Sequence, residues 1–263
     1  MLLSAILAPV LLSLMLLLPN GSSGGAAPAA ASGGPVLIEL FTSQGCASCP
    51  PADRLLSRLA RDPKLAGKVI PLAFHVDYWD YIGWQDPFGS PRWSQRQKDY
   101  AKAFRSNRIY TPQLVVGGSA ECVGSQEREV LKRIGDALAA PPAGRVTLAV
   151  EPPTPEGHLR VKIGASLAQA TAPHDLDVWV AVFQTGLVTP VGAGESASHT
   201  LHDDYVVRRL EKAFTLPGTA GAQRSGEIVL GLDKRWKMSG LGVAAFLQDP
   251  ATLRIHGAYS TRI

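Results

Sequence analysis

Two cysteines separated by two residues are the strongest chemical signal in this sequence. Cys46 and Cys49 follow a short apolar run and a Gly-containing turn, and one turn of helix would bring their sulfurs within bonding reach. Amides at a helix N-terminus, together with the helix dipole, lower a cysteine pKa from about 8.5 to roughly 3.5–7.5. We therefore expect Cys46 to attack the disulfide of a partner and Cys49 to resolve the mixed disulfide.

Two other uses of the same pair stay open. A zinc or copper site would recruit further ligands, for which His75 is a candidate, although its place in an apolar run is more typical of a core histidine. The other alternative is a structural disulfide within a binding module. We expect no resident metal and no cofactor.

A Thr-Pro step further along the chain adds to the pattern. Thr111 and Pro112 lie between a predicted helix and a predicted strand. X-Pro bonds adopt the cis form at a cost of only about 0.5–1 kcal/mol. A cis proline here would face the dithiol, and its neighbouring backbone would pair with an extended substrate peptide. The alternative is an ordinary trans proline at the start of a strand.

Two acids lie close to the cysteines in the sequence. Glu39 lies within the apolar run that precedes them. Burial would raise its pKa, and an acid behind a dithiol can move protons during exchange. A structural network with backbone or with an arginine explains Glu39 equally well. Asp53 is predicted to be a solvated helix residue.

Residues 77–88 form a loop that is dense in aromatic side chains. Tyr78, Trp79 and Trp84 belong to it, and we expect the loop to lie on the side where the helix after the cysteines begins. Such side chains can form a platform for a peptide or a small molecule. The alternative is that they pack beneath the following helix or against the second half of the chain.

Apolar periodicity predicts the elements that position these residues. Their order is β-α-β-α-β-β-α, with the cysteines at the first strand-helix junction, which is typical of a thioredoxin-like α/β domain over residues 36–140. Cys122 falls on the predicted hairpin and is expected to be a buried free thiol. The expected strands are 36–41, 68–76, 113–116 and 120–123, and the expected helices are 51–60, 91–104 and 127–140.

From residue 145 onward, apolar residues alternate with other residues with a period of two. Short strands separated by Gly, Pro and Asp turns are typical of a β-sandwich. We therefore predict an all-β sandwich-like domain over residues 145–263, with the boundary at 141–144. The expected strands are 145–150, 158–163, 176–182, 205–210, 227–230, 242–248 and 253–259.

The N-terminal stretch predicts export. Residues 1–19 are apolar and uncharged, so we expect a signal peptide over 1–31 and a spacer over 32–35. No Lys or Arg precedes the apolar run, and its length approaches the roughly 17–25 residues that span a bilayer, so an uncleaved anchor is the alternative. The folded part is expected to be periplasmic or secreted, with membrane contact only through this segment.

Composition excludes some partners. The 26 Lys and Arg residues are scattered among 22 acids, for a net charge of +4. Binding of nucleic acid uses a clustered basic face, and the sequence has none, so we expect no nucleic-acid partner. A protein or peptide thiol or disulfide is the expected substrate.

Several sequence blocks together form a recognisable pattern. They are ELFTSQGCASCPPAD at 39–53, FHVDYWD at 74–80, GWQDPF at 83–88, YTPQ at 110–113, VGS at 123–125 and, more weakly, HTLHDDYVVR at 199–208. These blocks resemble a family of secreted bacterial proteins known as domain of unknown function 1223. The resemblance implies a thioredoxin-like fold and export, and it matches Cys46, Cys49 and Pro112 to thioredoxin-like positions. Gly45 stands where thioredoxin has tryptophan, and Pro50 follows the second cysteine, which argues against thioredoxin's own reductant role.

Overall fold

The computed structural model describes residues 34–140 and 142–263. The predicted signal peptide and the start of the spacer lie outside the described residues. Within the described residues, no helix is both long enough and apolar enough to cross a membrane. The helices are α1 (Pro50–Arg61), the 3-10 turn η1 (Asp80–Ile82), α2 (Pro91–Ala103) and α3 (Glu127–Ala139).

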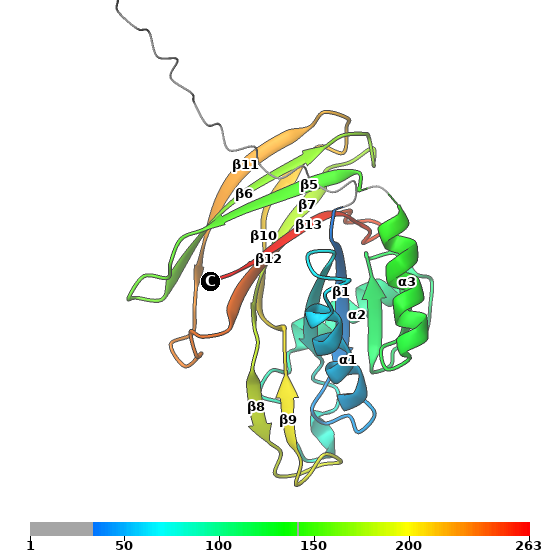
Figure 1. Cartoon of the computed structure of the whole chain (residues 1–263), viewed down its shortest axis with the longest axis vertical. Coiled ribbons are helices and arrows are strands. Elements are labelled where there is room, and N and C mark those ends of the chain that lie inside the picture. The colour runs from blue at the N-terminus through cyan, green and yellow to red at the C-terminus, as the bar shows by residue number, and fades with distance from the viewer. Residues whose placement is uncertain (1–33, 141) are drawn as a thin grey trace, which may run out of the picture. The chain divides into compact units, whose positions relative to one another are not determined.

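Strands make up most of the regular structure (Figure 1). They are β1 (Val36–Thr42), β2 (Val69–His75), β3 (Gln113–Val116), β4 (Ala120–Val123), β5 (Gly144–Val150), β6 (His158–Leu167), β7 (Leu176–Gln184), β8 (Leu187–Pro190), β9 (Thr200–Asp203), β10 (Val206–Leu216), β11 (Gln223–Gly231), β12 (Leu241–Gln248) and β13 (Ile255–Arg262). They form an eight-stranded mixed sheet in the order β13-β12-β7-β10-β2-β1-β3-β4, a three-stranded sheet β11-β6-β5, and the hairpin β8-β9.

The predicted fold class, a thioredoxin-like α/β domain followed by a separate all-β sandwich-like domain, is wrong. Strand β10 runs parallel to β2, with Val206 opposite Ala73, and the Ala73 N–H donates to the Tyr205 carbonyl at 2.8 Å. This pairing joins strands from both halves of the chain into one sheet. Alternation in the sequence reveals the two faces of a strand but not its neighbour, so the contact between β2 and β10 left no local signal.

The hydrophobic core also extends across both halves. Phe183 on β7 and Phe246 on β12 pack into the same buried cluster as Phe74 on β2. The alternate residues of β7 and β12, such as Val182 and Val243, point to the other face and pack against the three-stranded sheet. Because side chains alternate across a strand, β7 and β12 contribute to two apolar layers at once.

Helices cover both faces of the β1–β4 part of the sheet. The leucines of α1 are buried, and Arg58 of α1 pairs with Glu127 of α3 at 2.9 Å, so these two helices share one face (Figure 1). On the opposite face, Trp93 of α2 packs edge-on against Phe74, with ring centroids 5.2 Å apart. The turn between β1 and α1 lies at the end of β1, where it contacts the segment between β2 and α2 and the loop between β8 and β9.

A shared core predicts joint unfolding of the two halves. We expect Phe246→Ala, which removes a fully buried ring, to lower the free energy of unfolding by about 3–5 kcal/mol. Urea unfolding followed by circular dichroism and by tryptophan fluorescence should show both halves shifting together in one transition. Two separate unfolding transitions, with only the transition of the C-terminal half shifted to lower urea concentration by Phe246→Ala, would contradict the shared core.

Candidate functional site

The Cys46–Cys49 pair closes across the start of α1. The two sulfurs lie at disulfide-bonding distance, with the Cα atoms 5.4 Å apart, and Cys49 is the N-cap residue of α1. Local sequence explains the placement, because the β1 strand ends at Thr42, a turn follows, and Pro50 is well suited to the first turn of a helix. The structure thus brings the two predicted reactive sulfurs together.

Both sulfurs are buried, although the attacking role expected of Cys46 requires an accessible sulfur. Cys46 is 1% exposed and Cys49 is 0% exposed. The residues between them, Ala47 and Ser48, are exposed and form the accessible surface of the turn. The two sulfurs therefore lie behind the backbone of the turn and behind the groups that cover them.

Thr111 and Trp79 form one part of this cover. The Thr111 hydroxyl donates to Cys46 Sγ at 3.2 Å, and Trp79 Nε1 donates to Thr111 Oγ1 at 2.8 Å. The Thr111–Pro112 bond is cis, as predicted. A Cβ atom on Gly45 would lie 3.1 Å from the Trp79 Cβ, so a larger residue at this position would crowd Trp79.

The loop between β8 and β9 forms another part of the cover. Glu195 Oε2 accepts the Ala47 N–H at 3.3 Å, so a carboxylate from the second half binds the amide between the cysteines. Beside it, Gly194 packs against Trp84, whose Nε1 donates to Gln44 Oε1 at 3.2 Å. The disulfide site is thus completed by residues that lie far beyond it in the chain.

The aromatic residues expected to form a substrate platform are mostly engaged inside the protein. Tyr78 donates to Gln97 Oε1 at 3.1 Å, and burial raises the pKa of Tyr78 to about 12. Trp79 and Trp84 use their ring N–H groups within the site, and among the aromatic residues of this loop only Tyr81 is widely exposed, at 81%. These rings form the walls of the disulfide site.

Glu39 lies on the other face of the sheet from α1. It is fully buried, it accepts from Arg96 Nε at 2.7 Å, and it also accepts the Tyr100 hydroxyl. Gln248 on β12 donates to that same hydroxyl at 3.0 Å. Leu40, its neighbour on β1, points towards α1 instead. The alternation of side chains therefore places Glu39 in the structural network and away from the dithiol.

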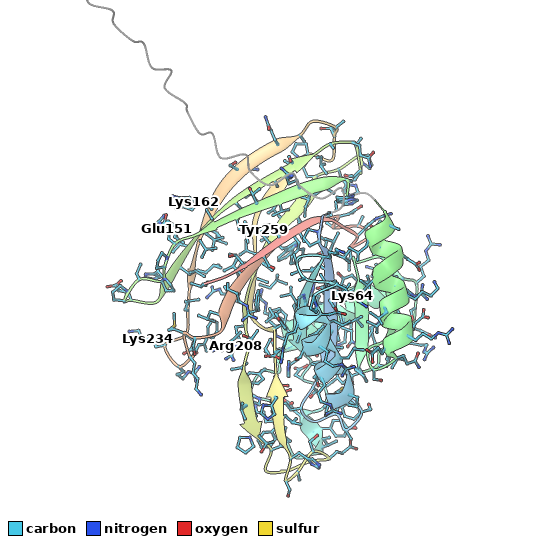
Figure 2. The ribbon with its side chains drawn as sticks, in the orientation of Figure 1. Lys64, Glu151, Lys162, Arg208, Lys234 and Tyr259 are labelled. Atoms are coloured by element: carbon cyan, nitrogen blue, oxygen red, sulfur yellow. A yellow bond between two sulfur atoms is a disulfide. The ribbon has the colours of Figure 1, made fainter. Side chains whose placement is uncertain are left out.

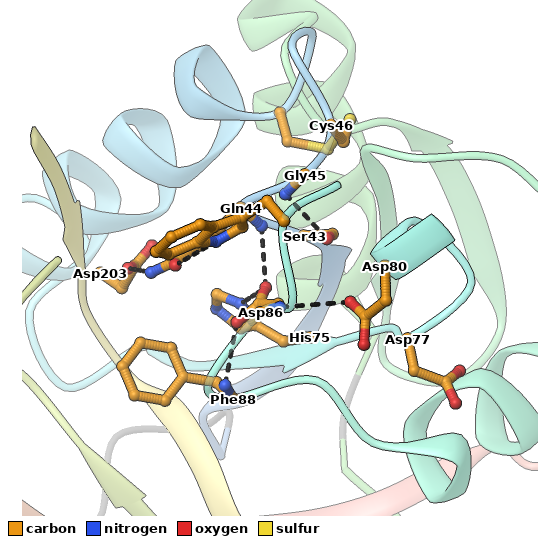
Figure 3. A network of polar contacts seen from close by, with 12 residues as sticks. Ser43, Gln44, Gly45, Cys46, His75, Asp77, Asp80, Asp86, Phe88 and Asp203 are labelled. Carbon is orange, nitrogen blue, oxygen red and sulfur yellow. Dashed lines mark hydrogen bonds and ion pairs between the residues drawn. A yellow bond between two sulfur atoms is a disulfide. The ribbon is translucent and has the colours of Figure 1, made fainter. Parts of the chain in front are cut away.

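A buried polar cluster lies beneath the turn that carries the cysteines (Figure 3). His75 Nδ1 is 2.7 Å from Asp86 Oδ2. Gln44 connects this pair to the turn, since its N–H donates to Asp86 Oδ2 at 2.8 Å and its Nε2 donates to Asp203 Oδ2 at 2.7 Å. We call His75, Asp86, Asp203 and Asp53 the His75 cluster. It joins β2, the aromatic loop and β9 to the start of α1.

The acids of the His75 cluster set the charge of its histidine. Burial lowers the pKa of His75, but the neighbouring charge of Asp86 and its hydrogen bond, aided by Asp203 and Asp53, outweigh burial and raise the pKa to about 9. Burial raises the pKa of Asp86, but the His75 charge and several hydrogen bonds bring it below its usual value. The result is a buried imidazolium–carboxylate pair at neutral pH.

Asp53 titrates differently from Asp86. Burial and the nearby Asp203 charge raise the pKa of Asp53 to about 7, and burial also raises the pKa of Asp203. Asp53 was expected to be solvated, but it is half-buried on α1, one helical turn after Cys49. A carboxyl group whose pKa is raised towards neutral pH therefore lies in the first turn of the helix that begins at the cysteine pair.

Sequence reasoning missed two members of this cluster, Asp86 and Asp203, together with the neighbouring Gln44 and Glu195. None of these four has a recognisable spacing; Gln44 and Asp203, for example, are 159 residues apart. His75 is buried, as expected of a core histidine, but its ring is charged and paired. Within the described residues, no group of three or more His, Cys, Asp or Glu side chains is arranged to hold a metal ion.

The third cysteine lies away from the pair. Cys122 on β4 is a buried free thiol, as predicted. Burial raises its pKa to about 11, so it is protonated and unreactive at neutral pH.

Solved structures share this arrangement across both halves of the chain. Protein AGR_C_4864 from Agrobacterium tumefaciens is 26% identical, with a TM-score of 0.66 over 89% of this chain and 96% of that one. HBP35 of Porphyromonas gingivalis is 16% identical, with a TM-score of 0.63 over 89% of this chain and 76% of that one. A search of curated proteins found no match. The model of a family described as protein of unknown function (DUF1223) matches residues 37–248, and the chain therefore belongs to this family.

Proposed function

We propose that this protein is an exported thiol–disulfide exchange protein whose reactive pair is Cys46 and Cys49. The observation that carries the proposal is a disulfide closed at the start of α1 with the Thr111 hydroxyl directed at the leading sulfur at 3.2 Å. A hydroxyl donor and a helix N-terminus both stabilise a thiolate. The substrate class is a protein or peptide that carries a thiol or a disulfide.

The exchange moves two electrons in two steps. The Cys46 thiolate attacks one sulfur of the partner's disulfide, that bond breaks, and the departing thiolate takes up a proton. The Cys49 thiol then loses its proton and attacks Cys46 Sγ, which expels the second partner thiolate and leaves the Cys46–Cys49 disulfide. The reverse sequence oxidises a partner dithiol and reduces the pair.

The His75 cluster supplies a proton acceptor for the second step. Asp53 follows Cys49 by one helical turn, and burial together with Asp203 raises its pKa to about 7. A group with this pKa takes up and gives back a proton at neutral pH, which is the property that general base catalysis needs. In this proposal Asp53 accepts the Cys49 proton, and His75 keeps the neighbouring acids in place.

Two features support export. The apolar, uncharged stretch at residues 1–19 is typical of an export signal. Disulfides persist in oxidising compartments such as the periplasm and the extracellular space, and the Cys46 and Cys49 sulfurs are at bonding distance.

The reduction potential of the pair tests the proposal. Equilibration of the full chain with glutathione buffers, followed by thiol alkylation and mass measurement, gives the potential of Cys46 and Cys49. An exchange protein should fall between about −120 and −270 mV, whereas structural disulfides lie below about −300 mV. A value in the structural range would contradict exchange.

Burial of both sulfurs favours a second candidate function. Cys46 and Cys49 are nearly inaccessible, as expected for a structural disulfide in a binding module. In that case the pair would fix the turn from β1 to α1, and the exposed Ala47 and Ser48 would belong to a recognition surface. The same potential measurement separates the two candidates, because only the structural pair resists mild reductant.

The Glu195 contact predicts the reactivity of the pair. We expect Glu195→Gln to increase the rate of reduction by dithiothreitol about two- to fivefold, since the carboxylate repels an approaching thiolate and occupies the Ala47 amide. The rate is measured by stopped-flow thiol detection. Glu156→Gln, an exposed acid in the turn before β6, is the matched control and should leave the rate unchanged. An unaltered rate in Glu195→Gln would exclude this role.

A further inference from the structure

Arg208 is held in an unusual position on β10. It is the extra residue of a β-bulge, because Val207 and Arg209 pair with the consecutive β7 residues Phe183 and Val182. A bulge redirects the side chain of the added residue. Figure 2 labels Arg208 at the end of the strands where the β11–β12 loop with Lys234 also lies.

Two aromatic rings hold the guanidinium of Arg208. Its Cζ lies 4.9 Å from the ring centroid of Phe88 and 4.9 Å from that of Trp236. Phe88 is itself fixed, because its N–H donates to Asp86 Oδ1 at 2.9 Å. Contact with two rings orders the planar group, whose N–H donors lie around the edge of its plane.

Those donors have no partner among residues 34–140 and 142–263. Arg208 forms no hydrogen bond or ion pair within these residues, and the nearby acids pair with other arginines instead. Glu211 lies 3.5 Å from Arg92 and 3.3 Å from Arg209, and Asp233 pairs with Arg235 at 2.5 Å. Burial lowers the pKa of Arg208, Asp233 opposes this shift, and Arg235 adds to it. Arg208 thus loses hydration without gaining a paired acid.

Arg208 and Trp236 line a groove of about 580 Å³. Arg92 and Arg209 also line it, together with Glu211 and Asp233. With Arg235 beside Asp233, the four arginines outnumber the two acids. The surroundings of the free guanidinium edge are therefore positive.

We propose that this groove is a binding site for the oxyanion group of a small ligand, a carboxylate or a phosphate, with Arg208 as the main donor. A planar guanidinium presents two parallel N–H groups that match two oxygens of such an anion. Binding would supply the acceptors that Arg208 lacks within the described residues. The site is separate from the cysteine pair and does not depend on its redox activity.

Titration calorimetry of the full chain at low ionic strength tests the site, with inorganic phosphate and succinate as probes. We expect at least one of them to bind at millimolar or lower concentration. Binding of phosphate alone identifies a phosphoryl ligand, and binding of succinate alone identifies a carboxylate. Arg208→Gln should weaken binding about tenfold or more, since it removes charge-assisted hydrogen bonds.

Two further variants make the test specific. Arg224→Gln is the matched control, because Arg224 also stacks on a ring, that of Phe214 at 5.1 Å, but lies outside the groove; it should bind like the wild type. Arg208→Lys keeps the charge and loses the planar fork, so it should also bind more weakly. Absence of binding by both probes, or equal binding by Arg208→Gln, would overturn the proposal. If Arg208→Lys bound the probes as tightly as the wild type, the planar guanidinium would not be what recognises the anion.

Discussion

Replacement of Cys46 by serine will abolish reduction of a model disulfide by the pre-reduced protein. A serine hydroxyl is not a nucleophile towards sulfur under these conditions, and Cys49 has the resolving role in the proposed exchange, so no attacking thiolate remains. With oxidised glutathione as substrate, the rate should fall to the uncatalysed background. The measurement is the release of reduced glutathione over time at pH 7.

Two companion variants separate chemistry from damage to the fold. Cys122→Ser removes the buried free thiol of β4 and should keep full activity. Cys49→Ser should still attack but should accumulate the mixed disulfide with glutathione on Cys46, visible as added mass. Activity that persists in Cys46→Ser, or that disappears in Cys122→Ser at unchanged stability, would contradict the assignment of Cys46 as the attacking residue.

Replacement of His75 by glutamine will destabilise the protein by about 3–5 kcal/mol near pH 6. The variant removes the cation from a buried pair in which His75 Nδ1 lies 2.7 Å from Asp86, and it leaves uncompensated buried acids. Urea unfolding gives the change in free energy. His174→Gln is the matched control, because His174 pairs with Asp249 at 2.9 Å but its side chain is 39% exposed; it should cost less than about 1 kcal/mol.

The pH dependence of this effect has a definite sign. The pKa of His75 is raised from 6.5 to about 9 in the folded protein, so its stabilisation is fully present below pH 6.5 and is lost as the pH rises through about 9. The difference between wild type and His75→Gln should therefore shrink over this interval. A difference that stays constant from pH 6 to pH 9.5 would show that His75 is not charged in the folded state.

Local structure around the cysteines could be predicted because it depends on neighbours in sequence. The apolar run before Cys46 predicts a buried strand, and the leucines after Pro50 predict a helix, so the pair falls at the junction that the structure shows. Cys122 was correctly placed in a buried strand. Periodicity also predicted that residues 145–263 are built of strands, although it missed the β8–β9 hairpin that supplies Glu195.

Residue types and spacing alone establish a cysteine pair at a strand-helix junction, because a strand end and a helix start depend on interactions between near neighbours. Only the tertiary structure decides that β10 pairs with β2, that the sulfurs are covered, and that Gln44 meets Asp203. These contacts join residues far apart in the chain, and strand periodicity records which face is buried, not which strand lies alongside. The environment that sets the pKa of His75 and Asp53 therefore arises only when the two halves close into one sheet.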